Sequence, residues 1–257
     1  MLAWSHRRQL VKNAILESFS PPEKAAIGPF LEAVDLKERI VLHDPRRPVD
    51  YVHFVESGVV SLRMVAAGSV LETAIVGNQG AVGVSSVFGV HIPMPQSVVL
   101  FPGTALRIHV DHLCRLVNEH PRIRDTLTRY VQALVMHSAQ TGFCGIRHSL
   151  EQRLASWLCL TCDAADRHVL PITHDSLSAI LGLRRAGVTE ALNRFEEQGL
   201  IQKTRGVLQI YDRKHLEQKA CTCYGIITKA YVSAARVPTH NKQKTSPDVC
   251  CLGHREI

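Results

Sequence analysis

The stretch THDSLSAILGLRRAGVTEALNRFEEQGLI, residues 173–201, constrains the fold of this chain most. Thr173 is a good N-cap residue and Asp175 a favourable first-turn acid, so a helix should begin here. Gly182 suits a tight turn, and Gly199 suits the end of a second helix. Apolar residues recur at helical spacing on both sides of the turn, and the predicted buried faces are Leu177, Ile180 and Leu181, then Val188, Leu192 and Phe195.

The residues after this helix pair read as a β-hairpin. The segment LIQKTRGVLQIYD has apolar runs on either side of Arg205 and Gly206, which fit a turn. A short helix docked across a longer one with a polar, cationic outer face is the geometry that enters a DNA major groove, and the hairpin would be a wing against phosphates. The predicted DNA-binding residues are Thr173, Arg184, Arg185, Thr189, Glu190, Asn193, Arg194, Lys203 and Arg205. Plain packing of two helices with a solvated charged face is the alternative interpretation.

Composition sets the class of protein. The chain has 257 residues, 46% of them hydrophobic, and a formal net charge of +7. That length supports one large or two ordinary domains. The charge around residues 173–201 is nearly balanced, so the prediction of DNA binding rests on individual cations. Without an apolar run near ~20 residues or a signal-peptide pattern, we expect a cytoplasmic protein that does not enter a membrane, with reduced thiols at its eight cysteines.

The hydrophobic period changes along the chain. From about residue 39 to 110, short β-branched runs such as YVHFVE, VVSLRMV, VLETAIV, SVVLF and ALRIHV alternate with turn residues, which predicts a β-sandwich or jelly roll. From about 111 to 165 the spacing is helical, with a break at TGFCG, residues 141–145. The segment from about residue 232 has almost no apolar period, which predicts disorder.

A heptad-like stripe in the helical part predicts a dimer. Steps of four and three from Ile123 reach further apolar residues, and such a stripe is what a seam between two helices requires. The predicted interface comprises Ile123, Leu127, Tyr130 and Leu134. The alternative, a helix packed against its own β domain, would use the same residues. Because Gly142 and Gly145 each weaken a helix by about 1 kcal/mol relative to alanine, we expect a soft junction after the seam.

Four segments together resemble one family. They are YVHFVESGVVSL with a turn glycine at Gly58, GNQGAVGVSSVFG at 77–89, LEQRLASWLC at 150–159, and the stretch from Leu170 to Ile201. In this order the chain resembles a Crp/Fnr-type transcription regulator over residues 20 to 225. The resemblance implies an α+β protein whose parts are a double-stranded β-helix (jelly roll) sensor domain at 20–115, a dimerisation helix and hinge at 116–148, a winged helix-turn-helix domain at 149–222, and a tail at 232–257.

The resemblance also implies function. It predicts a sequence-specific DNA-binding regulator, a homodimer on a palindromic operator in double-stranded DNA, with RNA polymerase and an unknown small-molecule effector as candidate further partners. It implies no cofactor and no enzymatic activity. The corresponding effector pocket would comprise Gly80, Val82, Gly83, Gln96 and Ser97.

Two departures from the family pattern qualify this picture. Members that bind cyclic AMP place a glutamate and an arginine where this chain has Val82 (or Ala81) and Gln96, and a neutral amide cannot replace a guanidinium on a phosphate. The sensor is therefore predicted not to bind cyclic AMP. The recognition pattern R-E-x-x-x-R is replaced by Arg185, Ala186 and Glu190, so the operator should differ from the guanine-rich half-site of those members.

Other chemistry is weakly indicated. The pairs Cys159-x-x-Cys162 and Cys221-x-Cys223 suit a zinc or redox site, but the helical spacing of the first pair and the tightness of the second favour ordinary buried thiols. We therefore predict no metal site and no catalytic residue. The alternatives are a zinc- or redox-sensing protein and a metal-dependent cupin-like enzyme, for which the candidate ligands are His53, His91 and His109.

Overall fold

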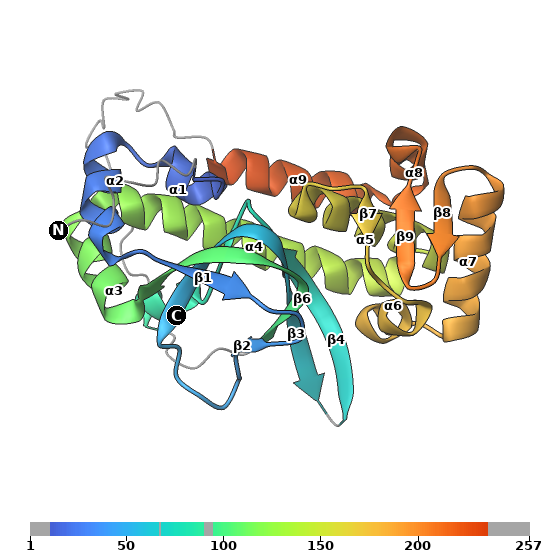
Figure 1. Ribbon diagram of the computed structural model, residues 1–257, viewed down its shortest axis with the longest axis horizontal. Helices are drawn as coiled ribbons and strands as arrows, with labels where there is room; N and C mark the ends of the chain where they lie inside the picture. The colour runs from blue at the N-terminus through green and yellow to red at the C-terminus, as the bar shows by residue number, and fades with distance from the viewer. Residues whose placement is uncertain (1–10, 67, 90–94, 236–257) are drawn as a thin grey trace, which may run out of the picture.

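The computed structural model describes residues 11–66, 68–89 and 95–235 (Figure 1). The N-terminal part is an antiparallel sheet in which the strand order is β1-β6-β3-β4, with β2 paired to β6 and β5 to β3. The strands are β1 (Glu32–Leu36), β2 (Val41–His43), β3 (Tyr51–Ala66), β4 (Ser69–Val76), β5 (Ala81–Val82) and β6 (Gln96–His109). Short helices flank the sheet: α1 (Ala14–Ser18), α2 (Pro21–Ile27), η1 (Gly28–Phe30) and η2 (Val84–Phe88). This is the predicted β domain.

Two of its strands are longer than the sequence indicates. The runs on either side of Gly58 form one strand, β3, and the runs SVVLF and ALRIHV also form one strand, β6. Gly58 is not at a turn. It has φ 81° where the pairing of β3 with β6 shifts register, and a Cβ there would lie 2.6 Å from the carbonyl oxygen of Phe101. Only glycine accepts that approach, so the bulge bends the strand where a turn was expected.

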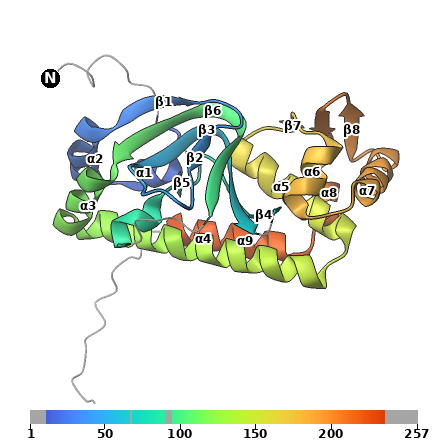
Figure 2. The ribbon, with the colours of Figure 1, turned by 90° about the horizontal axis from the view of Figure 1, so that it is seen from below.

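The helical part also differs from the expectation. Helix α3 (Val110–Glu119) is followed at once by α4 (Pro121–Arg147), which passes unbroken through residues 141–145. Two glycines cost a helix only about 2 kcal/mol. Helix α9 (Thr222–Ala235) packs along α4 and offsets that loss (Figure 2). The soft junction is thus a continuous helix.

The predicted dimer seam is turned inward, which corrects the assignment. Ile123 and Leu127 are fully buried against the β domain of the same chain, and the Tyr130 hydroxyl donates to the carbonyl oxygen of Ala81 at 2.8 Å. Leu134 is half-buried against the same cores. The stripe is therefore the helix's own attachment to the β domain, as in the alternative interpretation. Periodicity shows that a face is covered but not what covers it.

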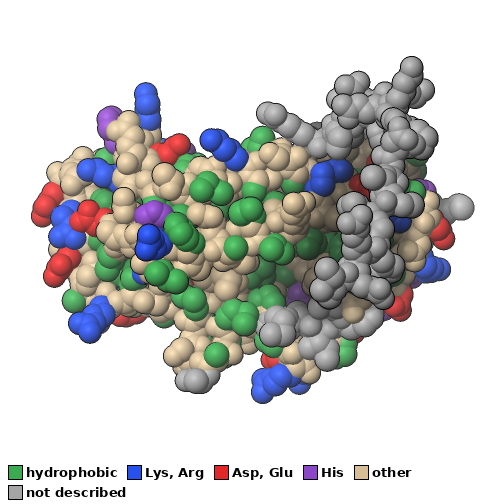
Figure 3. Space-filling model, turned by 180° about the vertical axis from the view of Figure 1, so that it is seen from behind, with side chains coloured by type: hydrophobic (Ala, Val, Ile, Leu, Met, Phe, Trp, Pro, Cys, Tyr) green, Lys and Arg blue, Asp and Glu red, His purple; other side chains and the backbone are tan. Residues whose placement is uncertain are grey.

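The solvent-exposed face of α4 is displaced by one residue from the buried stripe that contains Leu127. Positions at steps of four and three on this face are Thr128, Gln132, Val135, Ala139, Gly142 and Ile146. Val135 is 63% exposed, and Met136, Phe143 and Ile146 are exposed beside it. Figure 3 looks onto this side of the molecule and shows apolar side chains gathered along its middle. We call this surface the outer face of α4.

The C-terminal part is a small domain whose core is continuous with Val59, Ile75 and Phe101 of the β domain. It comprises α5 (Leu150–Ala165), β7 (Val169–Leu170), α6 (His174–Leu181), α7 (Arg185–Glu197), β8 (Ile201–Thr204), β9 (Val207–Ile210) and α8 (Arg213–Lys219). The helix α9 that follows was not predicted. Its buried or half-buried residues Cys223, Ile227 and Tyr231 recur at steps of four, a signal too short to stand out in the sequence. Residues 232–235 belong to this helix, and the rest of the predicted tail lies outside the described residues.

Among the described residues, no helix is both long enough and apolar enough to cross a bilayer.

Candidate nucleic-acid interface

The helix pair forms as the sequence predicts. The Thr173 hydroxyl accepts from the backbone N–H of Ser176 at 3.1 Å and caps α6, and Gly182 ends it with φ 61°. Both predicted apolar faces are buried, since Leu177, Ile180, Leu181, Val188, Leu192 and Phe195 all belong to the core of this domain. The pair lies at the end of the molecule furthest from α2 (Figure 1). It presents the opposite face of α7 to solvent.

That outer face carries the predicted base-contacting residues. Arg184, Arg185, Glu190 and Asn193 are exposed, whereas Thr189 is half-buried and pairs with Nδ1 of His174 at 3.0 Å. Arg185 Nε lies 2.8 Å from Oδ1 of Asp175 on α6. Both side chains of this ion pair are about two-thirds exposed, so it is worth at most ~1 kcal/mol and yields readily to a stronger acceptor.

Two predicted DNA contacts are instead held within the protein. Lys203 Nζ lies 2.9 Å from Glu196 Oε2 and also pairs with Asn193, and its side chain is only 17% exposed. The backbone N–H of Lys203 donates to Glu196 Oε1 at 2.8 Å and, with the ammonium, lowers the pKa of Glu196. Arg194 is likewise paired with Glu151 on α5. Lys203 and Arg194 thus form ion pairs within the domain. The spacing of residues in the sequence does not reveal these pairs.

The remaining cations are free to meet a phosphate. Strands β8 and β9 form the expected hairpin beside α7 (Figure 1), with Arg205 exposed at its turn and Gly206 at φ 73°. In the part of the chain that the structure describes, neither Arg184 nor Arg205 has an ion-pair partner. The wing tip and the start of α7 are therefore the two places that offer an unpaired guanidinium next to the helix pair.

The residues predicted for an effector pocket do not converge. Val82 and Ser97 are buried, and Val82 belongs to the apolar core inside the β domain. Gln96 pairs opposite Arg63 and Ser97 opposite Leu62, so Gln96 and Ser97 point to opposite faces of the sheet. Grouping Gln96 with the others as one pocket is thus corrected. Neighbouring residues in a strand cannot line the same side of it.

The two pocket glycines lie in closely packed surroundings, Gly80 against Tyr130 of α4 and Gly83 against His43. A Cβ at Gly80 would lie 2.6 Å from the Tyr130 hydroxyl, and Gly83 takes φ 89° at the start of η2. A cavity beside Gly80 and Tyr130 measures about 40 Å³. That volume suits a water molecule rather than a nucleotide.

The candidate cupin ligands lie in different surroundings. His53 is buried, and burial, followed by the charges of His43 and Arg107, lowers the pKa of His53 to about 3. His109 caps α3 at the surface, where its Nδ1 accepts from the backbone N–H of Asp111 at 3.3 Å. His91 lies outside the described residues. The two described histidines do not form a common metal site.

A buried carboxyl joins the two domains. Glu72 on β4 is 4% exposed, and its Oε1 accepts from Trp157 Nε1 on α5 at 2.6 Å. Ser61 donates to its other oxygen, and Arg63 donates to Ser61 at 2.9 Å. Burial outweighs these contacts and raises the pKa of Glu72 to about 7. The β domain thus contacts the DNA-binding domain through a carboxyl whose pKa is raised by burial.

Comparison with known proteins supports this reading of the two domains. Residues 152–219 match the model of the Crp-like helix-turn-helix domain. The chain is 23% identical over 201 residues to the global nitrogen regulator of a Synechocystis strain, covering 74% of this chain and 88% of that protein.

Solved structures share the fold. A Crp/Fnr-family transcriptional regulator from Eubacterium rectale has a TM-score of 0.61 at 17% identity, covering 80% of this chain and 96% of that one. The c-di-GMP responsive global regulator CLP of Xanthomonas campestris has a TM-score of 0.61 at 14% identity, covering 75% and 99%. The comparisons give the enzyme alternative no support. Residues 152–219 therefore form a Crp-like helix-turn-helix domain, and the chain as a whole is similar in sequence and fold to transcriptional regulators of the Crp/Fnr type.

Proposed function

We propose that the protein acts in the cytoplasm as a homodimer that binds an inverted-repeat operator through α7. The observation that carries the proposal is the exposed N-terminal face of α7, with Arg184 and Arg185 beside an exposed wing arginine, Arg205. The N-terminal residues of a recognition helix contact base edges in the major groove. The wing then meets phosphates, which set register without reading sequence.

The outer face of α4 supports the dimer. It is apolar around Val135, Phe143 and Ile146 and repeats at steps of four and three over five turns. Two such helices related by a two-fold axis form a seam, and a dimer of helix-turn-helix domains then spans half-sites about 34 Å apart. Contact with RNA polymerase and binding of a small-molecule effector stay predictions.

Replacing Arg185 by alanine tests base reading. We expect Arg185→Ala to cost about 1–3 kcal/mol on the operator and little on random DNA, because a guanidinium that forks onto guanine distinguishes base pairs. The measurement is a fluorescence-anisotropy titration with a bound operator identified by genome-wide mapping. The ion pair with Asp175 adds little to either value, since both side chains are exposed.

Arg205→Ala at the wing tip is the matched control. It removes an exposed guanidinium that we assign to phosphate, so it should weaken both DNAs equally and reduce the salt dependence of binding by about one phosphate contact. Equal losses on both DNAs for Arg185→Ala would show that Arg185 does not read a base.

Cyclic AMP should leave the protein unaffected. Val82 is packed in the core, Gln96 stands in place of the arginine and faces the other side of the sheet, and Tyr130 closes the space at Gly80, so the described residues leave no cavity for the sugar there. We expect no binding heat at micromolar protein and no change in operator affinity. Calorimetric binding at micromolar concentration would contradict this assignment.

A further inference from the structure

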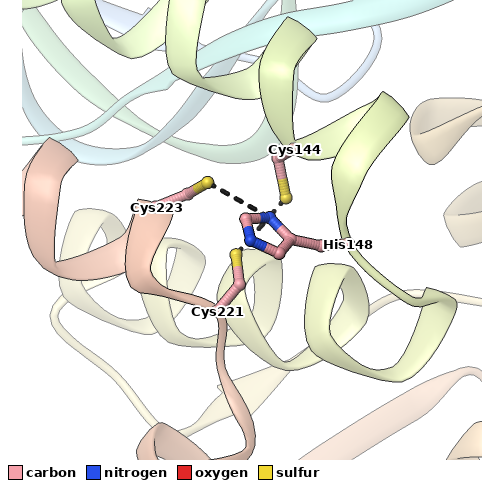
Figure 4. Close-up of side chains that lie close together, drawn as sticks. All are labelled: Cys144, His148, Cys221 and Cys223. Atoms are coloured by element: carbon pink, nitrogen blue, oxygen red, sulfur yellow. Dashed lines mark hydrogen bonds between the residues drawn. The ribbon is translucent and has the colours of Figure 1, made fainter.

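Four side chains that are distant in the sequence meet where the two domains join. Cys144 lies in the last turn of α4, His148 directly follows that helix, and Cys221 and Cys223 lie at the start of α9. Figure 4 shows the three sulfur atoms and the imidazole turned toward one another. Their ligand atoms all lie within 4.8 Å of one another. Spacing alone singles out only the Cys221-x-Cys223 pair, and the fold brings in the other two residues.

The geometry matches a single tetrahedral ion. Cys144 Sγ lies 3.4 Å from Cys221 Sγ, and Cys223 Sγ lies 3.4 Å from His148 Nδ1. Four ligands around zinc, with Zn–S bonds of about 2.3 Å, place neighbouring sulfurs about 3.8 Å apart. The sulfur atoms of Cys144 and Cys221 would need to move apart by only about 0.4 Å to reach that spacing. An iron–sulfur cluster holds several metal ions between its cysteines and needs more room than this.

The chemistry of the ligand set favours zinc. Three thiolates and one imidazole are a common set for a structural zinc ion, and soft sulfur ligands exclude magnesium and calcium. The three cysteines are buried and form a cluster apart from the apolar cores of the molecule. By contrast, Cys159 is buried within α5, where its sulfur accepts from Arg213 at 3.0 Å. The pair Cys159 and Cys162 is therefore an ordinary part of the core.

Neighbouring donors point at the sulfurs. Gln140 Nε2 donates to Cys223 Sγ at 3.3 Å. The Ser156 oxygen accepts from the backbone N–H of Cys221 at 3.0 Å and lies 3.0 Å from its sulfur, to which the hydroxyl donates once that sulfur is a thiolate. Hydrogen bonds of this kind orient metal ligands and balance the negative charge of thiolates.

We propose that Cys144, His148, Cys221 and Cys223 bind one zinc ion, which fastens α9 to the end of α4. Binding releases the thiol protons, since the ligands must be three thiolates and a neutral imidazole. Because the ligands come from both sides of the DNA-binding domain, the ion ties the entry and exit of that domain to the same helix.

Metal analysis of the full-length chain tests the proposal. Protein purified without oxygen, in the presence of zinc, should retain about one zinc ion per chain after desalting. Cobalt in its place should give the strong visible absorption of tetrahedral thiolate coordination. Removing the ion with a chelator should lower the melting temperature by about 10 °C, and added zinc should restore it.

Variants identify the ligands. Losing a hydrogen-bond partner behind a ligand already costs about 10–100-fold in affinity, so Cys223→Ser and His148→Gln should each lower zinc affinity by at least about 100-fold. The matched control is Cys114→Ser, because Cys114 is a half-exposed cysteine on α3 outside the cluster. This variant should bind zinc normally. If a ligand variant fails to fold, the cobalt spectrum of the unaltered protein decides.

Two results would overturn the site. One is zinc retention by the unaltered protein no higher than that of Cys223→Ser, with no thiolate-type cobalt spectrum. The other is a disulfide between Cys144 and Cys221 in protein kept without oxygen. Operator binding is measured separately, so protein that retains no zinc when purified in its presence, yet binds the operator, would refute the zinc site and leave the proposed function standing.

Discussion

Val135→Glu should turn the protein into a folded monomer and lower its operator affinity by roughly 100-fold to 10,000-fold. Val135 is 63% exposed in the single chain, so the change leaves the fold intact. In the proposed dimer it would bury two carboxylates against each other at the seam. Two linked half-site contacts gain that range of affinity over one, and the monomer loses it. Sedimentation and operator titration of the variant give both answers.

Two other glutamates make this test specific. Val41 is an exposed valine on β2, so the Val41→Glu protein should stay dimeric and bind DNA normally. Leu134→Glu should instead unfold the protein, because Leu134 packs against the cores of the β domain. A dimeric Val135→Glu that binds the palindrome as tightly as the unaltered protein would rule out the outer face of α4 as the interface.

Glu72→Gln should stabilise the protein by roughly 3 kcal/mol at pH 8 and by less than about 1 kcal/mol at pH 5. Burial raises the pKa of Glu72 from 4.5 to about 7. The folded state therefore holds a proton that the unfolded chain releases above pH 4.5. This contribution is complete below pH 4.5 and is lost as the pH rises through 7, where the carboxylate must be buried charged. A glutamine is neutral throughout and still accepts from Trp157.

The quantity to measure is the difference in unfolding free energy between the variant and the unaltered protein from pH 5 to pH 8. The difference is needed because burial lowers the pKa of His43 and His53, so these histidines destabilise the fold as the pH falls. Glu38→Gln, which makes the same change at an exposed position, is the matched control. A difference that does not change with pH would mean that Glu72 titrates in its ordinary range.

The helix pair and wing could be predicted because their signals are local. Thr173 and Gly182 mark ends within a few residues, and the apolar spacing of α7 shows its buried face. The pairing of Lys203 with Glu196 could not be predicted, because the sequence around a lysine is the same whether its ammonium is paired or free.

Long-range packing explains the other differences. The stripe from Ile123 to Leu134 is apolar whether a second chain or the β domain covers it. Cys144 and Cys221 are 77 residues apart, so no spacing rule joins them. The register of β3 depends on a bulge at Gly58. In the sequence, a glycine between two apolar runs fits a bulge as well as a turn.

The return of α9 along α4 limits how the DNA-binding domain moves. The chain enters this domain from the end of α4 and leaves it through a helix that packs back on α4, so once the contacts of α5 and α6 with β3 and β4 open, the domain stays attached at two points rather than one. A body held at two points turns readily only about the line that joins them. In the proposed dimer, a signal from the β domain is therefore expected to roll the two recognition helices about such axes, which changes their tilt in the grooves while the distance between them stays nearly constant.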